Sequence, residues 1–505
     1  MTLKPSRAAG RDHFQVDRTE QPDPWLLNYV CSVNSLHTRR PQDGFTCCEI
    51  GSGEGRDLVF LAAANPKGHF FGIETNEELY ASASQFLSGS DPGNCVFYQH
   101  PPAELGRLNI PQLDFLLLKG TLSPDDTTSY SSVMSFAAQH LKPGGVVLCS
   151  YRTPHAWAFW EPMIHFLKVT ADAPGNRGEQ IQFGLRELHR LRDAGAGLFQ
   201  VSPLMEIILE SIADFDPRTF DINFLRRPST ALHFDEVCRT MENIGLAYAG
   251  GFPLAFNYPQ IWLPANLKDR LASFHSLKLR ETWLDLVRMP FFRQDIFTSR
   301  ATVHNPVLPR EIILGSLLQR GYFQFAFDIP GAPSVHLDGP LFQLLADLLA
   351  ENAMPLAEII SWPALKDFPE VEILSGLSWM TAMGQIHPFA SRIVDDGSGN
   401  LFRLSSFNSA VLDIQLSGHE GDVVLSSWTL GSSIALSRKR ALALLALSEA
   451  GPEEAEDWAG RWLVNHTLAG DHDPDESSLG EIIGHARANP RSLAALGLSE
   501  KDSQN

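Results

Sequence analysis

The sequence predicts an α/β protein whose first large unit is a parallel sheet with helices on both faces. Between residues 45 and 152, short apolar runs alternate with stretches of helical periodicity, and this order is typical of a parallel sheet. The runs are apolar along most of their length, as expected for strands buried on both faces. The 505 residues are too many for one hydrophobic core, so further units must follow.

The elements of this first unit follow from the local pattern. Strands are expected at 45–51, 68–74, 94–100, 113–120 and 146–152, where apolar residues gather between turn residues. Helices are expected at 55–66, 76–89 and 130–145 from their helical apolar pattern. The last of these helices ends in a Pro-Gly-Gly sequence, which stops helical hydrogen bonding.

The remaining chain divides by composition and periodicity. Residues 1–44 form an N-terminal cap and 45–158 the sheet unit, which a helix and strand within 228–258 could complete. We expect a helical insertion at 159–227, which could also form a dimer contact. A helical middle domain is expected at 259–380, with helices up to residue 300, and an α+β, winged-helix-like C-terminal domain at 381–505.

Composition and charge exclude several function classes. Lys and Arg number 40 and Asp and Glu 59, and the net charge of −19 disfavours binding to nucleic acid. No apolar stretch is long enough to span a membrane and the first residues lack an apolar signal segment, so we expect a cytoplasmic protein. The six cysteines are expected to be free core thiols. Because neither CxxC nor HExxH occurs, no metal site is predicted.

The most informative motif is the turn after the first strand. Glu49, Gly51, Gly53 and Gly55 alternate there, and glycines let a ligand approach the backbone without interference from Cβ. The spacing differs from the GxGxxG turn that receives a pyrophosphate, so it suits a ligand without phosphate. Glu74 ends the second strand, where it could accept both hydroxyls of a ribose. Two alternatives stay open: a nicotinamide enzyme, and glycines that only allow close packing.

With this turn in view, residues 45–157 resemble the class I S-adenosylmethionine-dependent methyltransferases, which have a Rossmann-like core. The resemblance implies that S-adenosyl-L-methionine is the cofactor, bound by the four residues of the turn, and that Glu74 binds its ribose. Such folds often place an acid after the third strand to meet the adenine. This chain has YQHPPAEL there, so Gln99, His100 or backbone atoms would take that role.

Further segments resemble the rickettsial-type protein lysine methyltransferases. The sequences LDFLLLKGTLSPDD and LKPGGVVLCSYRTPHAW are similar to that family's fourth and fifth strand regions, although Arg152 and His155 depart from its pattern. Residues 281–300 are similar to its middle segment, and 339–366 and 421–448 to its methyltransferase regulatory domain. The resemblance implies a bacterial enzyme that methylates lysine on a protein partner; a homodimer and a small acceptor stay open.

Candidate acceptor-site residues follow the strands at the carboxyl edge, where open α/β sheets bind ligands. Tyr151 and Trp157 are expected to wall a slot for the acceptor, because aromatic faces hold an ammonium group; core packing is the alternative for Trp157. His155 could accept a proton, since its ordinary pKa is about 6.5, or it is a surface or capping residue. The resemblance places Lys119 and Thr121 beside the methyl-transfer site, although Lys119 could equally be a loop cation.

Arg288 and Arg293 stand beside Phe291 and Phe292, and either bind an acidic partner or pack over aromatic rings inside the protein. The functional interpretation is a methyltransferase that acts on protein lysine. Two alternatives stay open. One is a small-molecule or saccharide O-methyltransferase with His155 as general base, and the other is a noncatalytic module that binds the cofactor.

Overall fold

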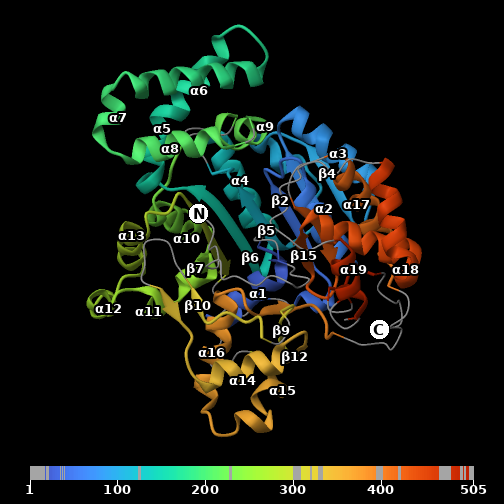
Figure 1. Ribbon diagram of the computed structural model, residues 1–505. Coiled ribbons are helices and arrows are strands. Elements are labelled where there is room, and N and C mark those ends of the chain that lie inside the picture. The colour runs from blue at the N-terminus through green and yellow to red at the C-terminus, as the bar shows by residue number, and fades with distance from the viewer. Residues whose placement is uncertain are drawn as a thin grey trace.

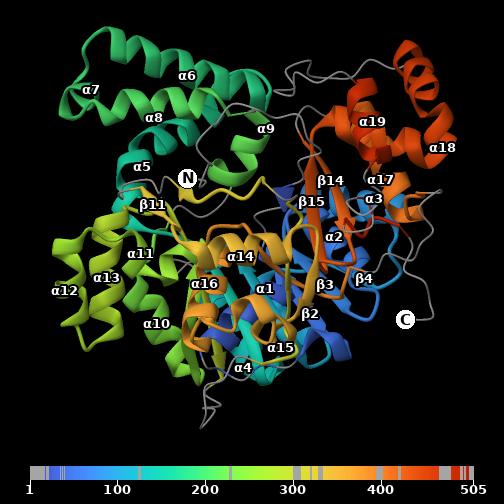
Figure 2. The ribbon, with the colours of Figure 1, turned by 60° about the horizontal axis from the view of Figure 1, so that its bottom comes forward.

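The chain surrounds one central sheet (Figure 1). A helical insertion stands over one end of this sheet and a helical lobe lies at the opposite end, while the C-terminal unit lies against its flank (Figure 2). Among the described residues, no helix is long and apolar enough to cross a bilayer. The computed structural model describes residues 17–18, 22–34, 36, 38, 40–122, 127–215, 217–226, 230–299, 309–318, 321–327, 334–393, 402–418, 422–465, 479–488, 493 and 496–499.

The central sheet has the strand order β4-β3-β2-β5-β6-β8-β7. Strands β2 to β6 run parallel, and β8 runs antiparallel to both of its neighbours. The carboxyl ends of the parallel strands therefore share one edge, which carries the candidate site. The bounds are β2 (Thr46–Ile50), β3 (His69–Glu74), β4 (Cys95–Gln99), β5 (Leu113–Lys119), β6 (Leu141–Arg152), β7 (Leu246–Phe252) and β8 (Phe292–Ser299).

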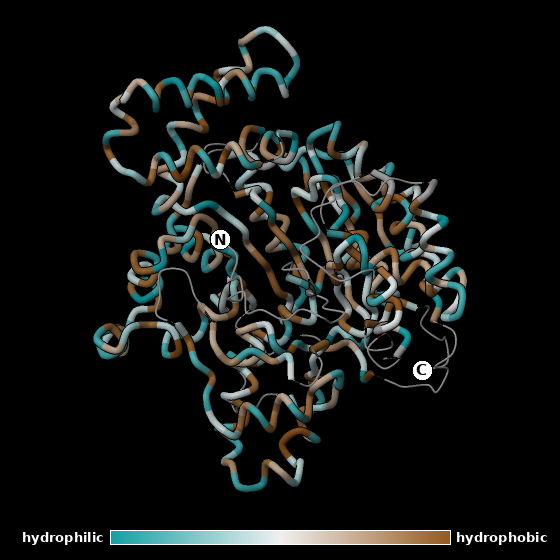
Figure 3. The backbone as a smooth tube through the Cα atoms, in the orientation of Figure 1, coloured by the Kyte–Doolittle hydropathy of each residue, from teal (hydrophilic) through white to brown (hydrophobic). Residues whose placement is uncertain are grey.

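Helices cover both faces of the sheet, which confirms the Rossmann-like α/β fold. One core joins the sheet to α1 (Pro24–Val33), α2 (Arg56–Ala64) and α3 (Glu77–Ser90). The other joins it to α4 (Thr127–His140) and α10 (Phe234–Asn243). The adjacent Cys47 and Cys48 point into opposite cores, as the period of a strand requires, and all six cysteines are free and buried. Figure 3 shows the apolar strands between these helices.

The structure corrects the prediction that residues up to 300 are helical. The chain leaves α13 (Leu277–Arg288) and enters the sheet as β8, between β6 and β7, so the sheet is mixed. This strand could not be recognised from the sequence pattern, because charged residues such as Arg293 and Asp295 are usually exposed to solvent. Both side chains are buried, and the Arg293 guanidinium donates to the Asp295 carboxylate at 2.9 Å. A buried ion pair therefore sits where the pattern predicts an apolar residue.

The helical insertion follows β6 directly and has a core of its own. A short α-helical turn and a π-helical turn bring the chain back to the carboxyl edge of the sheet. The bounds are α5 (Pro154–Val169), α6 (Arg177–Asp193), α7 (Gly197–Val201), α8 (Leu204–Ala213) and α9 (Pro217–Phe220), with the π turn at Asp221–Leu225.

The middle of the chain forms a lobe with its own apolar core. A small sheet with the strand order β12-β9-β13 and the hairpin β10-β11 connect its helices. The bounds are α11 (Pro259–Trp262), α12 (Ala265–Ala272), β9 (Ile313–Gly315), β10 (Ala326–Phe327), β11 (Val335–His336), α14 (Pro340–Leu349), β12 (Ala353–Pro355), α15 (Leu356–Ile360), α16 (Glu370–Ala382) and β13 (His387–Phe389).

The C-terminal unit packs on α2, the helix that begins at the glycine turn. The Ser426 hydroxyl donates to the Phe60 carbonyl at 2.7 Å, and the Asn65 side chain donates to the Gly431 carbonyl at 2.8 Å. Strand β1 (Asp17–Arg18) pairs with this unit at β15. The other bounds are α17 (Ser406–Gly418), β14 (Val423–Ser427), β15 (Ser432–Leu436), α18 (Arg438–Asn465) and α19 (Leu479–Ala488).

Candidate cofactor and acceptor site

The glycine turn connects β2 to α2 and is built from left-handed backbone. Gly51, Gly53 and Gly55 have φ values of 80°, 59° and 68°, a region that other residues rarely adopt. A Cβ on Gly51 would lie 2.6 Å from the carbonyl oxygen of Lys119, and a Cβ on Gly55 would lie 2.4 Å from the Phe97 ring. The bare backbone here is therefore required by the local packing as well as by the dihedral angles.

Glu74 lies beside this turn at the end of β3 and is buried, with 8% of its surface exposed. Its carboxylate accepts the backbone N–H groups of Gly53 at 2.7 Å, Thr75 at 2.9 Å and Asn76 at 3.0 Å. A carboxylate accepts about four hydrogen bonds, so three backbone donors leave capacity for a hydroxyl. Glu74 thus fixes the turn against β3 and can still accept from a ribose.

Glu49 faces Lys119 across the two neighbouring strands. The Lys119 amine lies 2.9 Å from the Glu49 carboxylate and 3.2 Å from that of Asp57, in the first turn of α2. Burial lowers the pKa of Lys119, but the two carboxylates raise it by more, so the net shift is upward. Lys119 is therefore a charged partner beneath the turn and is unsuited to accept a proton.

Gln99 and His100 lie next to Glu74, at the end of β4. Gln99 pairs with Glu74 in the strand register and is exposed. The backbone N–H of His100 donates to the Glu74 carbonyl at 3.1 Å, and its ring nitrogen Nδ1 lies 3.2 Å from the Pro101 carbonyl oxygen. Both residues border the same edge as the turn, where the adenine of the implied cofactor would be recognised.

These residues fit the cofactor that the resemblance implies. The turn lets a ligand reach bare backbone, and the neighbouring carboxylate of Glu74 suits a pair of hydroxyls. The helix α2 begins at Arg56, directly after its N-cap residue Gly55, and presents its first N–H groups at this edge, which favours a ligand carboxylate. Gly51, Gly53, Gly55 and Glu74 would hold the cofactor.

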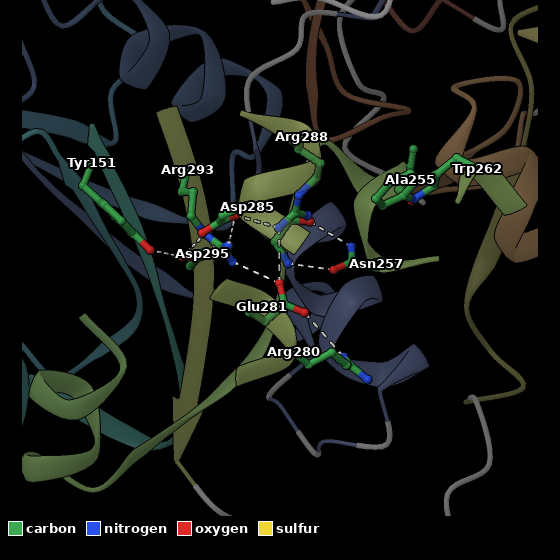
Figure 4. A network of polar contacts seen from close by, with 11 residues as sticks. Tyr151, Ala255, Asn257, Trp262, Arg280, Glu281, Asp285, Arg288, Arg293 and Asp295 are labelled. Carbon is green, nitrogen blue, oxygen red and sulfur yellow. Dashed lines mark hydrogen bonds and ion pairs between the residues drawn. The ribbon is translucent and has the colours of Figure 1, made fainter. Parts of the chain in front are cut away.

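Tyr151 lies next to the edge, but its hydroxyl points into the protein (Figure 4). It donates to the carboxylate of Asp295 on β8, and only 3% of the residue is exposed. Burial raises the pKa of the Tyr151 hydroxyl, and the Asp295 charge raises it further. Asp295 therefore fixes the orientation of the Tyr151 ring, which we expected to line the acceptor site, and the phenol of Tyr151 stays neutral.

Asp295 belongs to a network that contains Arg293, Arg288, Glu281 and Asp285 (Figure 4). Arg288 is half-buried, and the other members are buried. Arg293 donates to Asp285 at 2.6 Å and to Glu281 at 3.3 Å, and Arg288 donates to Asp285 at 2.8 Å. Burial raises the pKa of Asp295 although Arg293 opposes this shift. Both arginines are therefore occupied inside the protein, as in the packing alternative, and do not present their charges to a partner.

Trp157 and His155 lie on the first turns of α5. Trp157 is 3% exposed, packs in the core of the insertion and lies 5.4 Å from the Phe291 ring, centroid to centroid. The ring of His155 lies 5.5 Å from that of His233. Burial lowers the pKa of His155 and outweighs the opposing charge of Asp285, so its imidazole is neutral and able to accept a proton.

Two charged residues that were not predicted from the sequence contact the turn region. Asp57 follows Gly55 by two positions, and an acid there is a recognisable signal for the start of a helix. Arg218 of α9 donates to Glu54 within the turn at 2.7 Å. No local pattern reveals this second contact, because 164 residues separate its partners.

Comparisons with known proteins agree with this geometry. A family model described as a methyltransferase domain matches residues 41–180, and one described as a predicted methyltransferase regulatory domain matches residues 223–299. An uncharacterized protein of Synechocystis is 24% identical over 434 residues, which cover 84% of each chain.

Two solved structures of PKMT2 from Rickettsia typhi share the fold. The structure in complex with AdoHcy has a TM-score of 0.70 at 13% identity and covers 94% of this chain and 97% of its own. The second has a TM-score of 0.69 at 13% identity and covers 96% and 99%. The shared fold extends through the insertion and the later units.

Proposed function

Because this chain is an S-adenosylmethionine-dependent methyltransferase with a methyltransferase regulatory domain, we propose that its acceptor is a lysine side chain of a protein. The observation that carries this proposal is the extent of the fold likeness to PKMT2. That likeness covers 94% of the chain and includes the regions outside the cofactor core, where acceptor specificity usually resides. The segment resemblances to protein lysine methyltransferases point the same way.

The site supports this chemistry through its carboxyl edge. When bound, S-adenosylmethionine supplies a methyl group already activated by a positively charged sulfur. The protein must place a neutral amine within about 3–3.5 Å of that methyl and in line with it. A lysine amine has an ordinary pKa of about 10.4, so it must lose its proton first. The aromatic side chains around Trp157 would give the amine apolar surroundings, in which its charged form is disfavoured.

The residues that hold the cofactor are part of the proposal. Gly51, Gly53 and Gly55 would receive its amino-acid end, with Glu49 and Lys119 as the charged support beneath the turn. Glu74 would bind the ribose, and Gln99 and His100 would border the adenine. Tyr151 and Trp157 would wall the acceptor slot. The backbone of the glycine turn, the Glu74 carboxylate and the Glu49–Lys119 ion pair are already oriented before a ligand binds, and this favours the proposed roles.

The domain arrangement suits a protein acceptor. The insertion exposes Val201 to 80% and Ile207 to 62% of their surfaces, and such apolar residues mark contact surfaces for proteins. We propose that the insertion contacts the acceptor protein or a second copy of the chain, which sedimentation analysis with and without acceptor would distinguish. The free thiols favour the cytoplasm as the working compartment.

One observation favours a second candidate, an O-methyltransferase of small molecules or saccharides. His155 lies at the acceptor side of the edge and its pKa is lowered by burial. Among the residues that the structure describes, its buried Nδ1 has no hydrogen-bond partner. A neutral imidazole in such a place could remove the proton of a hydroxyl. This reaction requires a base, whereas transfer to an amine requires only that the amine be neutral.

Transfer of a labelled methyl group separates the two candidates. Purified protein is incubated with methyl-labelled S-adenosylmethionine and a lysate, and the protein fraction is hydrolysed to amino acids. Label in methylated lysine supports the proposal, and label confined to low-mass material supports the second candidate. The Gly53→Arg variant serves as the control, because an arginine at this left-handed backbone position (φ 59°) would disturb the cofactor turn.

A further inference from the structure

Residues 217–226, which we call the strap, lead from the insertion back to the carboxyl edge of the sheet. The strap consists of α9, the π turn and Arg226. Figure 1 shows α9 between the helices of the insertion and those of the cofactor unit. π-helical turns are rare and are often found at functional sites. The contacts on the two sides of the strap indicate what this one does.

Two ion pairs connect the strap to the loops that follow β2 and β3. Arg218 donates to the carboxylate of Glu54, within the glycine turn, at 2.7 Å. Arg226 donates to the carboxylate of Glu78, in the first turn of α3. Because β2 and β3 are neighbours in the sheet, the strap spans the two loops that are proposed to hold the amino-acid end and the ribose of the cofactor.

Aromatic rings fix the strap to the insertion on its other side. Phe220 and Phe224 are both buried and belong to the apolar core of the insertion. The centroid of the Phe224 ring lies 5.0 Å from that of Phe220 and 6.0 Å from that of Trp160 on α5. Buried aromatic rings contribute strongly to packing, so this side of the strap is part of the insertion.

A buried carboxylate supplies a second connection to the insertion. Asp221 accepts from Arg177 of α6 at 2.8 Å and from Arg226 at 2.6 Å, and its own side chain is buried. Separating Asp221 from these cations would leave a buried charge without compensation, which is strongly unfavourable. The strap and α6 are therefore expected to move together.

The two sides of the strap thus differ in strength. The Arg218 side chain is 70% exposed and the Glu78 side chain 75%. Ion pairs with such exposed members are screened by water and salt, and each contributes little to stability. When the strap moves, it should therefore part from the cofactor loops and stay with the insertion.

We propose that the strap is a gate for the cofactor, which Arg218 and Arg226 close onto Glu54 and Glu78. The cofactor then enters and leaves when these two ion pairs break. This inference rests on the proposed function, because it takes the glycine turn as the place where the cofactor binds. Both arginines are positioning residues that act through the two loops. Weak contacts suit this role, since a gate must open within each turnover.

Release of S-adenosylhomocysteine, followed by stopped-flow displacement, tests the gate. Arg218→Gln and Glu78→Gln each remove one ion pair and leave the contacts of Asp221 in place. Each should speed release about two- to fivefold, and the double variant about four- to twenty-fivefold. Association should not slow, because an open gate does not hinder entry. Arg218→Lys keeps the charge and should release the ligand as wild type does.

Arg190→Gln is the matched control, because it breaks an exposed ion pair to Glu187 within α6. Its release rate should equal that of wild type. Unchanged release in the double variant overturns the inference. Slower association combined with weaker binding in that variant also overturns it, since this result assigns the two ion pairs a role in building the turn.

Ionic strength gives a readout that a packing role would not change. Wild-type release should accelerate between about 0.05 M and about 0.5 M KCl, because salt screens exposed ion pairs. The double variant has lost both pairs and should lose most of this acceleration. An equal salt dependence in wild type and in the double variant overturns the inference.

Hydrogen exchange with and without saturating S-adenosylhomocysteine distinguishes this inference from the proposed function. We expect slower exchange both in the glycine turn and in residues 217–226 when the ligand is bound. If the ligand does not bind to the wild-type protein, the proposed function fails and the inference fails with it. Protection of the glycine turn with unchanged exchange in residues 217–226 overturns the inference alone.

Discussion

The replacement Gly51→Ala tests whether the glycine turn is as tightly constrained as the structure shows. With φ at 80°, an alanine here is in the left-handed region, which costs about 1–2 kcal/mol. Its Cβ would also lie 2.6 Å from the backbone oxygen of Lys119 and 2.9 Å from the methyl group of Thr121. Overpacking of this kind costs about 1–3 kcal/mol. Because a backbone oxygen cannot rotate away, we expect a total loss of about 2–5 kcal/mol.

Gly93→Ala is a matched control. Gly93 has a φ of 79°, nearly that of Gly51, but no atom of the described residues lies within 4 Å of the Cβ that alanine would add. It lies in the loop before β4, at the opposite edge of the sheet from the cofactor turn. This variant should lose only the conformational contribution of about 1–2 kcal/mol. The difference between the two variants isolates the contact with Lys119.

Urea denaturation measures the stabilities, and calorimetric titration with S-adenosylhomocysteine measures the binding. We expect Gly51→Ala to lose at least tenfold in affinity, because the turn must shift to relieve the contact, and Gly93→Ala to bind as wild type. If Gly51→Ala were as stable as Gly93→Ala and bound with unchanged affinity, the close approach of β2 to β5 at this turn would have no role in the site.

Three further variants test other parts of the structure. Arg293→Met leaves three buried carboxylates without the cation that they share, so the free energy of unfolding should fall by about 3–5 kcal/mol. This loss should be smaller at low pH, where the carboxylates can be protonated. Urea denaturation at several pH values checks both expectations. Arg218→Gln removes an exposed ion pair to Glu54 and should speed S-adenosylhomocysteine release about two- to fivefold in stopped-flow fluorescence, whereas Arg190→Gln, on the far side of the insertion, should not. Because the pKa of His155 is lowered from 6.5, the unfolded chain takes up the proton first as the pH falls, so His155→Gln should lose less stability than wild type from pH 6.5 down to 5; thermal denaturation across that range checks the slope.

Local pattern was sufficient to predict the glycine turn and the acid that lies beside it. The alternating glycines, the continuous apolar strands and the acid that ends β3 are all short-range features, and each depends on the backbone geometry of a few residues. The structure places Glu74 against Gly53 at 2.7 Å, as the order of the strands requires. The same reasoning explains why Cys47 and Cys48 face opposite cores, since strand periodicity is a local property.

The surroundings of the proposed acceptor residues depend on contacts between distant segments. Tyr151 bonds to Asp295 across 144 residues, and Arg218 bonds to Glu54 across 164. The polar strand β8 enters the sheet because Arg293 is neutralised by carboxylates from α13 and from β8 itself. A sequence pattern records whether a residue is polar, but the free energy of burying its charge depends on which partner the fold brings to it. The glycine turn could therefore be predicted from its own residues, whereas the environment of Arg293 exists only after α13 and β8 have packed together.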